Sequence, residues 1–298
     1  MPATVPVNAH DTSWKIASPK NFLSANITGP NVTYNPDGTL VINPDANEVA
    51  ITGSARGLVV QTNQLLPALV VDVAAEEIVL RDSTSGLLYF AQNVDVQVNM
   101  PGTVGTPGAL DTGAETLNAW YYIWLISNGT TVAGLFSLSP TAPTLPAGYT
   151  FKARVGAVRN DAAGNFIRFV NLDRDVAQDM QLIFTAKPPV ANNTYEVLVG
   201  ADLTTFRAAV PPIAKRCRGN AGGVSGEASI AVAACYPDGT ANPNAIGAGV
   251  IIGASAGALL DGWACCGIFI VPVRGHNIQW KARIVGNNSR LAITGYSL

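Results

Sequence analysis

Histidine, the commonest acid or base in enzymes, occurs only twice in this 298-residue chain, as His10 and His276. His10 stands in an extended N-terminal stretch, and His276 stands in a predicted loop over residues 274–277. Neither is accompanied by a serine or cysteine in a recognisable motif, although nucleophilic catalysis needs a base beside the nucleophile. The sequence therefore predicts no catalytic residue and a protein that is not an enzyme.

Carboxylates gather at two places in the sequence. Glu76 and Glu77 are neighbours, and neighbouring residues of a strand point to opposite faces, so the two cannot act as a pair. Asp173, Asp175 and Asp179 are predicted to lie in a solvated loop, because the regular calcium loop that ends in glutamate is absent. We therefore predict no metal site and no cofactor.

All four cysteines stand in the last third of the chain, at Cys217, Cys235, Cys265 and Cys266. Their spacing fits no standard zinc motif, and only the two histidines could complete such a site. We predict buried, reduced thiols, and a reducing cytoplasm would leave such thiols unpaired.

Three basic residues, Lys215, Arg216 and Arg218, stand in a glycine-containing segment that is predicted to be an exposed loop. Such a loop is either simply solvated or binds an anion through charge-assisted hydrogen bonds. The anion would be a lipopolysaccharide phosphate or an acidic neighbouring subunit. A net charge of −2 is far from the basic footprint of a nucleic-acid binder, so no nucleic-acid partner is predicted.

The aromatic run 120–126 is the centre of the predicted fold. Asn128-Gly129 and a second apolar run, 132–136, follow it and predict a β-hairpin with a type I′ turn. The first run is apolar at nearly every position, so both of its faces should be buried. Its aromatic side chains could form a sugar-stacking platform, but a central strand favours packing in the core or between subunits.

Further strands are predicted on both sides of this hairpin. They cover 39–42, 49–52, 58–61, 68–73, 78–81, 87–92, 94–98, 152–159, 166–170, 228–235, 249–254, 263–273, 278–285 and 290–296. A helical turn is predicted at 204–209, and a second hairpin is predicted around 286–289. Residues 245–273 are apolar over the length of a membrane span, but glycines divide them, so they predict two buried strands and no membrane insertion.

Residues 1–20 hold three prolines and show no sustained periodicity. They form either a disordered or extended terminus or an arm that docks on a neighbouring subunit through Trp14 and Ile16. No basic segment followed by an apolar core is present, so secretion is not predicted.

Short strands and turn residues predict an all-β protein of two antiparallel β-sandwich, jelly-roll-like modules with an extended N-terminal arm. We expect a docking arm with lead-in strands over 1–55, a first sandwich over 56–190 and a C-terminal sandwich over 191–298. Charged residues make up only 13% of the chain, against about 25% in an ordinary domain. A surface so poor in charge predicts a subunit packed among neighbours, that is, a homo-oligomer.

Segments 108–113, 119–126, 141–150 and 152–159 resemble, in order and spacing, a module common in bacteriophage tail-fibre and related virion structural proteins. The ending 291–296 is similar to the last strand of such proteins. The resemblance implies a non-enzymatic β-structure in a virion, assembled in the cytoplasm of the bacterial host. Such proteins are usually oligomeric and often trimeric, and their partners are other virion proteins.

The resemblance leaves three positions in a particle open. The first is a tail fibre or a tail or baseplate subunit. The second is a host-attachment protein that grips host surface glycan through loops of residues 191–298. The third is a capsid decoration or head fibre protein.

Overall fold

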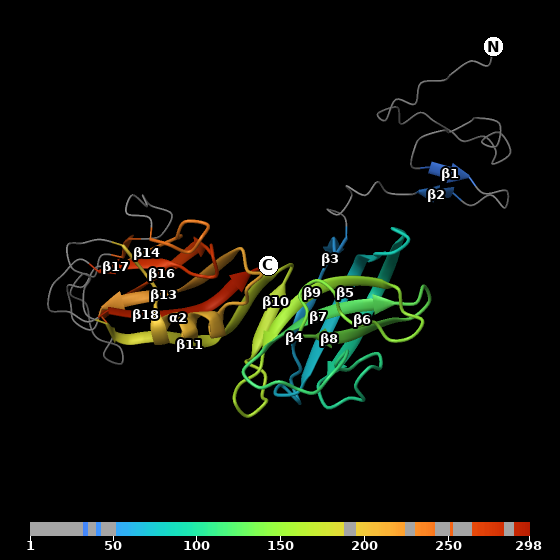
Figure 1. Ribbon diagram of the computed structural model, residues 1–298, viewed down its shortest axis with the longest axis horizontal. Helices are drawn as coiled ribbons and strands as arrows, with labels where there is room; N and C mark the ends of the chain where they lie inside the picture. The colour runs from blue at the N-terminus through green and yellow to red at the C-terminus, as the bar shows by residue number, and fades with distance from the viewer. Residues whose placement is uncertain are drawn as a thin grey trace, which may run out of the picture. The chain divides into compact units, whose positions relative to one another are not determined.

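The computed structural model describes residues 52–187, 195–223, 230–241, 251–252, 264–282 and 289–298, and the backbone of two short strands before them. Contacts divide the chain into two units, Met1–Glu48 and Val49–Leu298. The described residues form mainly antiparallel strands with one short helix, which confirms the prediction of an all-β protein (Figure 1). The finer prediction of two jelly-roll-like sandwiches stays a prediction.

In the first unit, β1 (Val32–Tyr34) and β2 (Leu40–Ile42) pair in antiparallel orientation. The second of them is the strand predicted at 39–42. Trp14 and Ile16, the predicted docking residues, lie outside the described residues, so the docking arm stays a prediction.

The described part of the second unit contains one sheet of twelve strands. Its N-terminal section runs in the order β10-β4-β5-β9-β7-β8, with β3 and β6 also paired to β5. These strands are β3 (Ala55–Arg56), β4 (Val59–Thr62), β5 (Val70–Asp82), β6 (Leu88–Asn99), β7 (Trp120–Ser127), β8 (Val132–Ser137), β9 (Phe151–Arg159) and β10 (Phe169–Leu172). Because β6 also contacts β8 without pairing to it, this section bends back and encloses a core.

Strand β5 is continuous where the sequence pattern predicts two strands, 68–73 and 78–81. Its core residues are odd-numbered up to Ala75 and even-numbered from Ile78 onward. This change of phase at Glu76 and Glu77 looks like a strand end in the sequence, yet the pairing with β6 keeps one register throughout. Strand β6 changes which of its residues face the core at the same level as β5 does. The two strands therefore stay paired although the alternation of buried and exposed residues is interrupted.

Strands β7 and β8 form the predicted hairpin, with Ser127 opposite Val132. The predicted type I′ turn is wrong, because it needs positive φ at two residues and in this loop only Gly129 has it, at 92°. The Asn128 side chain instead accepts hydrogen bonds from the backbone N–H groups two and three residues ahead, which closes a four-residue loop. As predicted, both faces of β7 are buried.

A hairpin that the sequence does not reveal joins β10 to β11 (Asp175–Lys187). Its turn residues, Asp173 and Arg174, have positive φ values of 46° and 74°, as in a type I′ turn. The solvated loop predicted for the three aspartates is therefore wrong. Asp173 lies in this tight turn, and Asp175 and Asp179 lie in β11.

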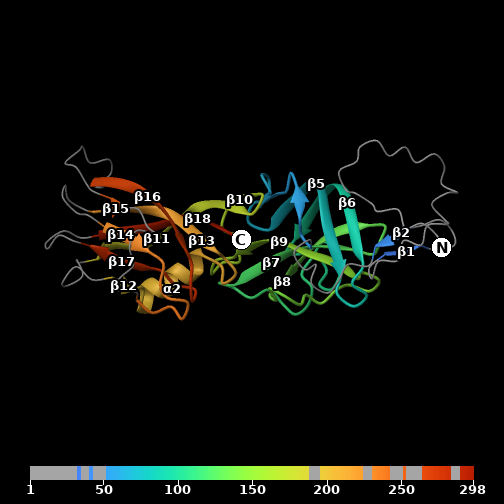
Figure 2. The same ribbon diagram turned by 90° about the horizontal axis from the view of Figure 1, so that it is seen from above.

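The C-terminal section of the same sheet has the order β16-β13-β18-β11. Its strands besides β11 are β13 (Arg216–Gly223), β16 (Ala264–Pro272) and β18 (Ser289–Ser297). A smaller sheet, in the order β12-β17-β14-β15, consists of β12 (Glu196–Val197), β14 (Ile230–Ala233), β15 (Ile251–Ile252) and β17 (Gln279–Ala282). The helical turn predicted at 204–209 is confirmed as α2 (Gly200–Ala209), which follows β12 in the chain (Figure 2) and contacts β11 and β18.

The hairpin predicted around 286–289 is wrong. In the described ranges β17 pairs with β12 and β14, whereas β18 pairs with β11 and β13. Turn-forming residues between two strands do not determine which other strands each of them pairs with. Among the residues described, no helix is long and apolar enough to cross a membrane, and the described parts of 245–273 are strands.

One cluster of buried side chains extends through both sections of the sheet. At their junction the Tyr296 hydroxyl donates a hydrogen bond of 3.0 Å to the Ala157 carbonyl, and the rings of Trp120 and Tyr296 meet edge to face. The boundary predicted near residue 190 lies outside the described residues, and β11 before it already pairs with β18. The predicted limits 1–55, 56–190 and 191–298 stay predictions.

Candidate functional site: an exposed face of the sheet

The C-terminal section of the sheet has one covered face. Its buried residues include Cys217 of β13, Phe269 of β16 and Ile293 of β18. They belong to the same cluster as Phe206 of α2 and Trp280 of β17, so the helix and the smaller sheet cover this side. Because side chains alternate along a strand, the residues between them point to the opposite side.

Cross-strand pairing arranges the residues of that opposite side in rows across β4, β10, β11, β18, β13 and β16. The first row is, in this strand order, Gln61, Val170, Ala177, Gly295, Arg218 and Ile270. The second row is Val59, Leu172, Asp175, Ser297, Arg216 and Pro272. We call these two rows, with the neighbouring Leu182 of β11 and Ile268 of β16, the outer face.

Apolar side chains of the outer face are open to solvent. Their exposed fractions are 67% for Ile268, 56% for Leu172 and Ile270, 38% for Val170 and 36% for Leu182. The prediction of two buried strands over 245–273 is therefore wrong for β16, which is buried on one side only. Apolar side chains exposed together on one face mark an interaction surface more often than a free surface.

A single ion pair crosses the middle of this face. The Arg218 guanidinium donates from Nη1 to Asp175 Oδ2 at 2.7 Å, so it reaches from β13 across β18 to β11. Gly295 of β18 lies directly beneath, and a Cβ atom there would collide with the Arg218 side chain and with the Val176 carbonyl oxygen. The missing side chain at this position lets the guanidinium lie flat on the sheet.

The three predicted basic residues are close together, but the predicted exposed loop is wrong. Arg216 and Arg218 belong to β13, and the Lys215 backbone, next to that strand, donates to the Ser297 carbonyl. Glycines in 219–223 give the segment a loop-like sequence although it pairs on both sides, with β16 and β18. Arg216 is exposed, and its side chain has no ion-pair or hydrogen-bond partner among the described residues.

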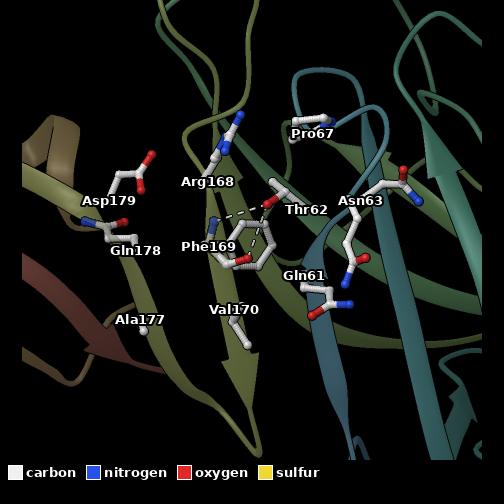
Figure 3. A pocket seen from close by; sticks show the side chains of 11 residues that line it. Gln61, Thr62, Asn63, Pro67, Arg168, Phe169, Val170, Ala177, Gln178 and Asp179 are labelled. Carbon is white, nitrogen blue, oxygen red and sulfur yellow. Dashed lines mark hydrogen bonds between the residues drawn. The ribbon is translucent and has the colours of Figure 1, made fainter.

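A hollow of about 460 Å³ lies at the end of the outer face where β4, β10 and β11 meet. Figure 3 shows Arg168 and Asp179 at one end of it and Gln61 at the other, with the Phe169 ring between them. The Thr62 hydroxyl hydrogen-bonds the Phe169 backbone at 3.4 Å and ties β4 to β10. Within the described ranges the side chains of Arg168 and Asp179 have no partner, so they can meet a ligand.

The aromatic run of β7 is part of the core. Tyr121 is fully buried, and Tyr122 and Trp124 are almost so. Trp120 is half-buried, and its Nε1 donates to the Arg207 carbonyl at 2.9 Å. The sugar-stacking platform considered for these residues is therefore wrong, since a platform needs an open ring face.

The thiols are predicted to be buried, and two of them are. Cys217 and Cys235 are buried and free. Burial raises the pKa of both thiols, that of Cys235 to about 12, so each is protonated and unreactive at neutral pH. Cys265 and Cys266 lie in β16, but their side chains are outside the described ones.

His276 lies at a tight turn, as predicted, and packs against the chain itself. Its Nε2 donates to the Val210 carbonyl at 2.7 Å, since a carbonyl can only accept. Burial lowers the pKa of this imidazole, and the nearby Arg207 lowers it further. In the part of the chain that is described, no group of three or more histidine, cysteine or acidic side chains could hold a metal ion.

No family model, curated protein or solved structure matches this chain. The outer face is thus characterised by its own residues alone. Sequence reasoning named Arg216 and Arg218 but missed the exposed apolar residues beside them, because Ile268-Phe269-Ile270 reads as a buried strand. In β10 the buried Phe169 and Asn171 alternate with the exposed Val170 and Leu172. This short alternation is the signal that could have revealed a strand buried on one side only.

Proposed function

We propose that this protein is a non-enzymatic structural protein of a bacteriophage virion, associated with the tail as a tail-fibre or tail or baseplate subunit. It acts by oligomeric packing and by docking onto the particle. The observation that carries the packing role is the outer face, where apolar side chains of β10, β11 and β16 lie open to solvent. The virion assignment draws its support from the order and spacing of the segments in 108–159, which resemble phage virion modules.

The chemistry of the described residues agrees better with packing than with catalysis. His276 is held by a backbone carbonyl, and the two described thiols are protonated at neutral pH. Asp175, the carboxylate at the centre of the outer face, accepts a hydrogen bond from Arg218. A general base or nucleophile needs a free and activated group, and these groups are committed to the fold.

The test combines mass and location. Light scattering of the purified chain gives its oligomeric state, and immunogold electron microscopy gives its place on intact particles. An oligomer with label on the tail supports the proposal, and label on tailless capsids replaces the tail assignment with a capsid decoration or head fibre. A monomer with no label on any particle refutes the virion function.

A second candidate function, binding of a host surface glycan, is favoured by the hollow at β4, β10 and β11. Arg168 offers hydrogen-bond donors and Asp179 offers acceptors, and Gln61 offers both, as a hydroxyl-rich ligand requires. This site differs from the loops of 191–298 that the sequence predicts for glycan binding. Binding of purified host saccharide, measured by calorimetry, should fall at least about tenfold in Arg168→Ala and Asp179→Ala. Asp95→Ala, on an exposed position of β6, is the control, and equal binding by all variants rejects the site.

A further inference from the structure

The two rows of the outer face are symmetric about β18. Each row, counted from β10 to β16, has an apolar residue at both ends. The ends are Val170 and Ile270 in the first row, and Leu172 and Pro272 in the second. The second row has an acid, Asp175, on one side of β18 and a base, Arg216, at the same level on the other side. A pattern with like ends and opposite charges is complementary to itself after a half-turn.

Consider two copies whose outer faces meet, related by a rotation of 180° about an axis that runs parallel to β18 between the two faces. This rotation places β13 of one copy over β11 of the other, and β16 over β10. Arg216 then faces Asp175 of the partner subunit, and the reverse contact forms at the same time. Ile270 meets Val170 of the partner subunit. An interface between identical copies with a two-fold axis needs such a self-complementary patch. We propose that the outer face binds the outer face of a second copy of this chain in this orientation.

The residues near the axis permit the close approach that packed sheets require. Gly295 and Ser297 of β18 are on the axis and Ala177 of β11 is beside it, so the middle of the face carries small side chains. Arg218 adds little height, because it lies across Gly295 toward Asp175. Packed sheets stand about 10 Å apart, a distance that the larger apolar residues at the row ends can fill.

The charges fix the orientation of the two copies. Asp175 uses Oδ2 for Arg218, and a carboxylate can accept further hydrogen bonds. Arg216 is exposed and unpartnered within the described ranges, so it can donate to Asp175 of the partner subunit. Opposite charges across an interface select the correct register, and like charges oppose association.

A charge-exchange experiment on the full chain tests the contact. Arg216→Glu places two carboxylates opposite each other at both contacts, and Asp175→Lys places two cations opposite each other. Each variant alone should associate at least about a hundredfold more weakly than the natural chain in sedimentation equilibrium. In an equal mixture the introduced carboxylate faces the introduced amine, while the second contact keeps the native pair, so association should return.

Lys215→Glu is the matched control, since it makes the same charge change at an exposed residue next to β13 that belongs to neither row. It should associate like the natural chain. The mixture also controls for Asp175→Lys losing its pair with Arg218, because a folding defect is not repaired by mixing.

The inference rests on the proposed packing function, and its failure is separable from failure of that function. Single variants that associate as tightly as the natural chain overturn the outer-face contact while leaving an oligomer built elsewhere. A mixture that stays monomeric overturns the two-fold orientation. A natural chain that is monomeric at every concentration overturns the inference, and label on particles then decides whether the virion function stands.

Discussion

Strands β7 and β16 have similar apolar sequences but different surroundings. From Tyr121 to Ser127 every residue of β7 is buried, so both of its faces are covered. In β16 the side chain of Phe269 is fully buried, whereas Ile268 and Ile270 on either side of it are mostly exposed. An apolar run therefore indicates a strand, but its burial depends on which other segments of the chain cover each face.

The second face of β7 is covered by the loop that follows β8. Trp124 belongs to a small cluster that includes Leu145 and Tyr149 of this loop, and its Nε1 donates to the Ser139 carbonyl at 3.3 Å. Arg154 adds a guanidinium 6.0 Å from the centre of the Tyr122 ring. The outer face of β16 has no such cover among the described residues.

The largest effect is expected from removing a side chain on the covered side. Trp124→Ala should lower the free energy of unfolding by about 3–5 kcal/mol, because it opens a cavity beneath the loop. Ile270→Ala should change it by less than about 1 kcal/mol in the monomer, because more than half of this residue is already exposed to water. Urea unfolding at low protein concentration measures both. Equal losses would contradict the difference between the two strands.

A smaller loss is expected where β18 passes beneath the ion pair. Gly295→Ala should cost about 1–3 kcal/mol of unfolding free energy, because the new methyl group meets Arg218 and the Val176 carbonyl. Ser297→Ala, on the same strand and face, should cost less and serves as the control. Unchanged stability in Gly295→Ala would contradict the close approach of both the Val176 carbonyl and the Arg218 side chain to Gly295.

Burial of His276 should also make the free energy of unfolding depend on pH. The folded pKa of His276 is lowered, chiefly by burial, so the unfolded chain takes up a proton that the folded chain refuses. Stability should therefore fall as pH drops below the unfolded value of 6.5. His276→Asn keeps a residue that tolerates the positive φ of 50° and should remove this part of the pH dependence. Identical profiles between pH 5 and 8 would refute the burial effect.

The smallest effect is expected from the ion pair on the outer face. Arg218→Ala should lower the unfolding free energy by at most about 1 kcal/mol, because both side chains are partly exposed and salt screens them. The loss should shrink further in 1 M salt. A loss as large as that of Trp124→Ala would mean that the outer face is covered within the monomer.

The sequence predicts the local features of this fold better than its long-range pairing. Asn128-Gly129 locates a turn, and the length of the apolar run identifies β7 as a central strand. Asp173-Arg174 forms a tighter, two-residue turn but is missed, because neither residue is a glycine to signal the positive φ values.

The candidate face depends on partners that are far apart in the sequence. Val170, Arg218 and Ile270 stand in one row only because β10, β11, β18, β13 and β16 are neighbours in that order. A single sequence shows how apolar and polar residues alternate along each strand, but not which strands pair with each other. The sequence alone identified Arg216 as a surface residue. It could not show that Arg216 and Asp175 lie at the same level on either side of β18.

The position of β18 between β11 and β13 also determines how this sheet can form. β11 ends at Lys187 and β18 begins at Ser289, so their pairing must close a long stretch of chain. Contacts of such high sequence separation form slowly. Until β18 inserts, β11 and β13 each present an unpaired edge to other chains. Refolding should therefore be slow, and its yield should fall as the protein concentration rises.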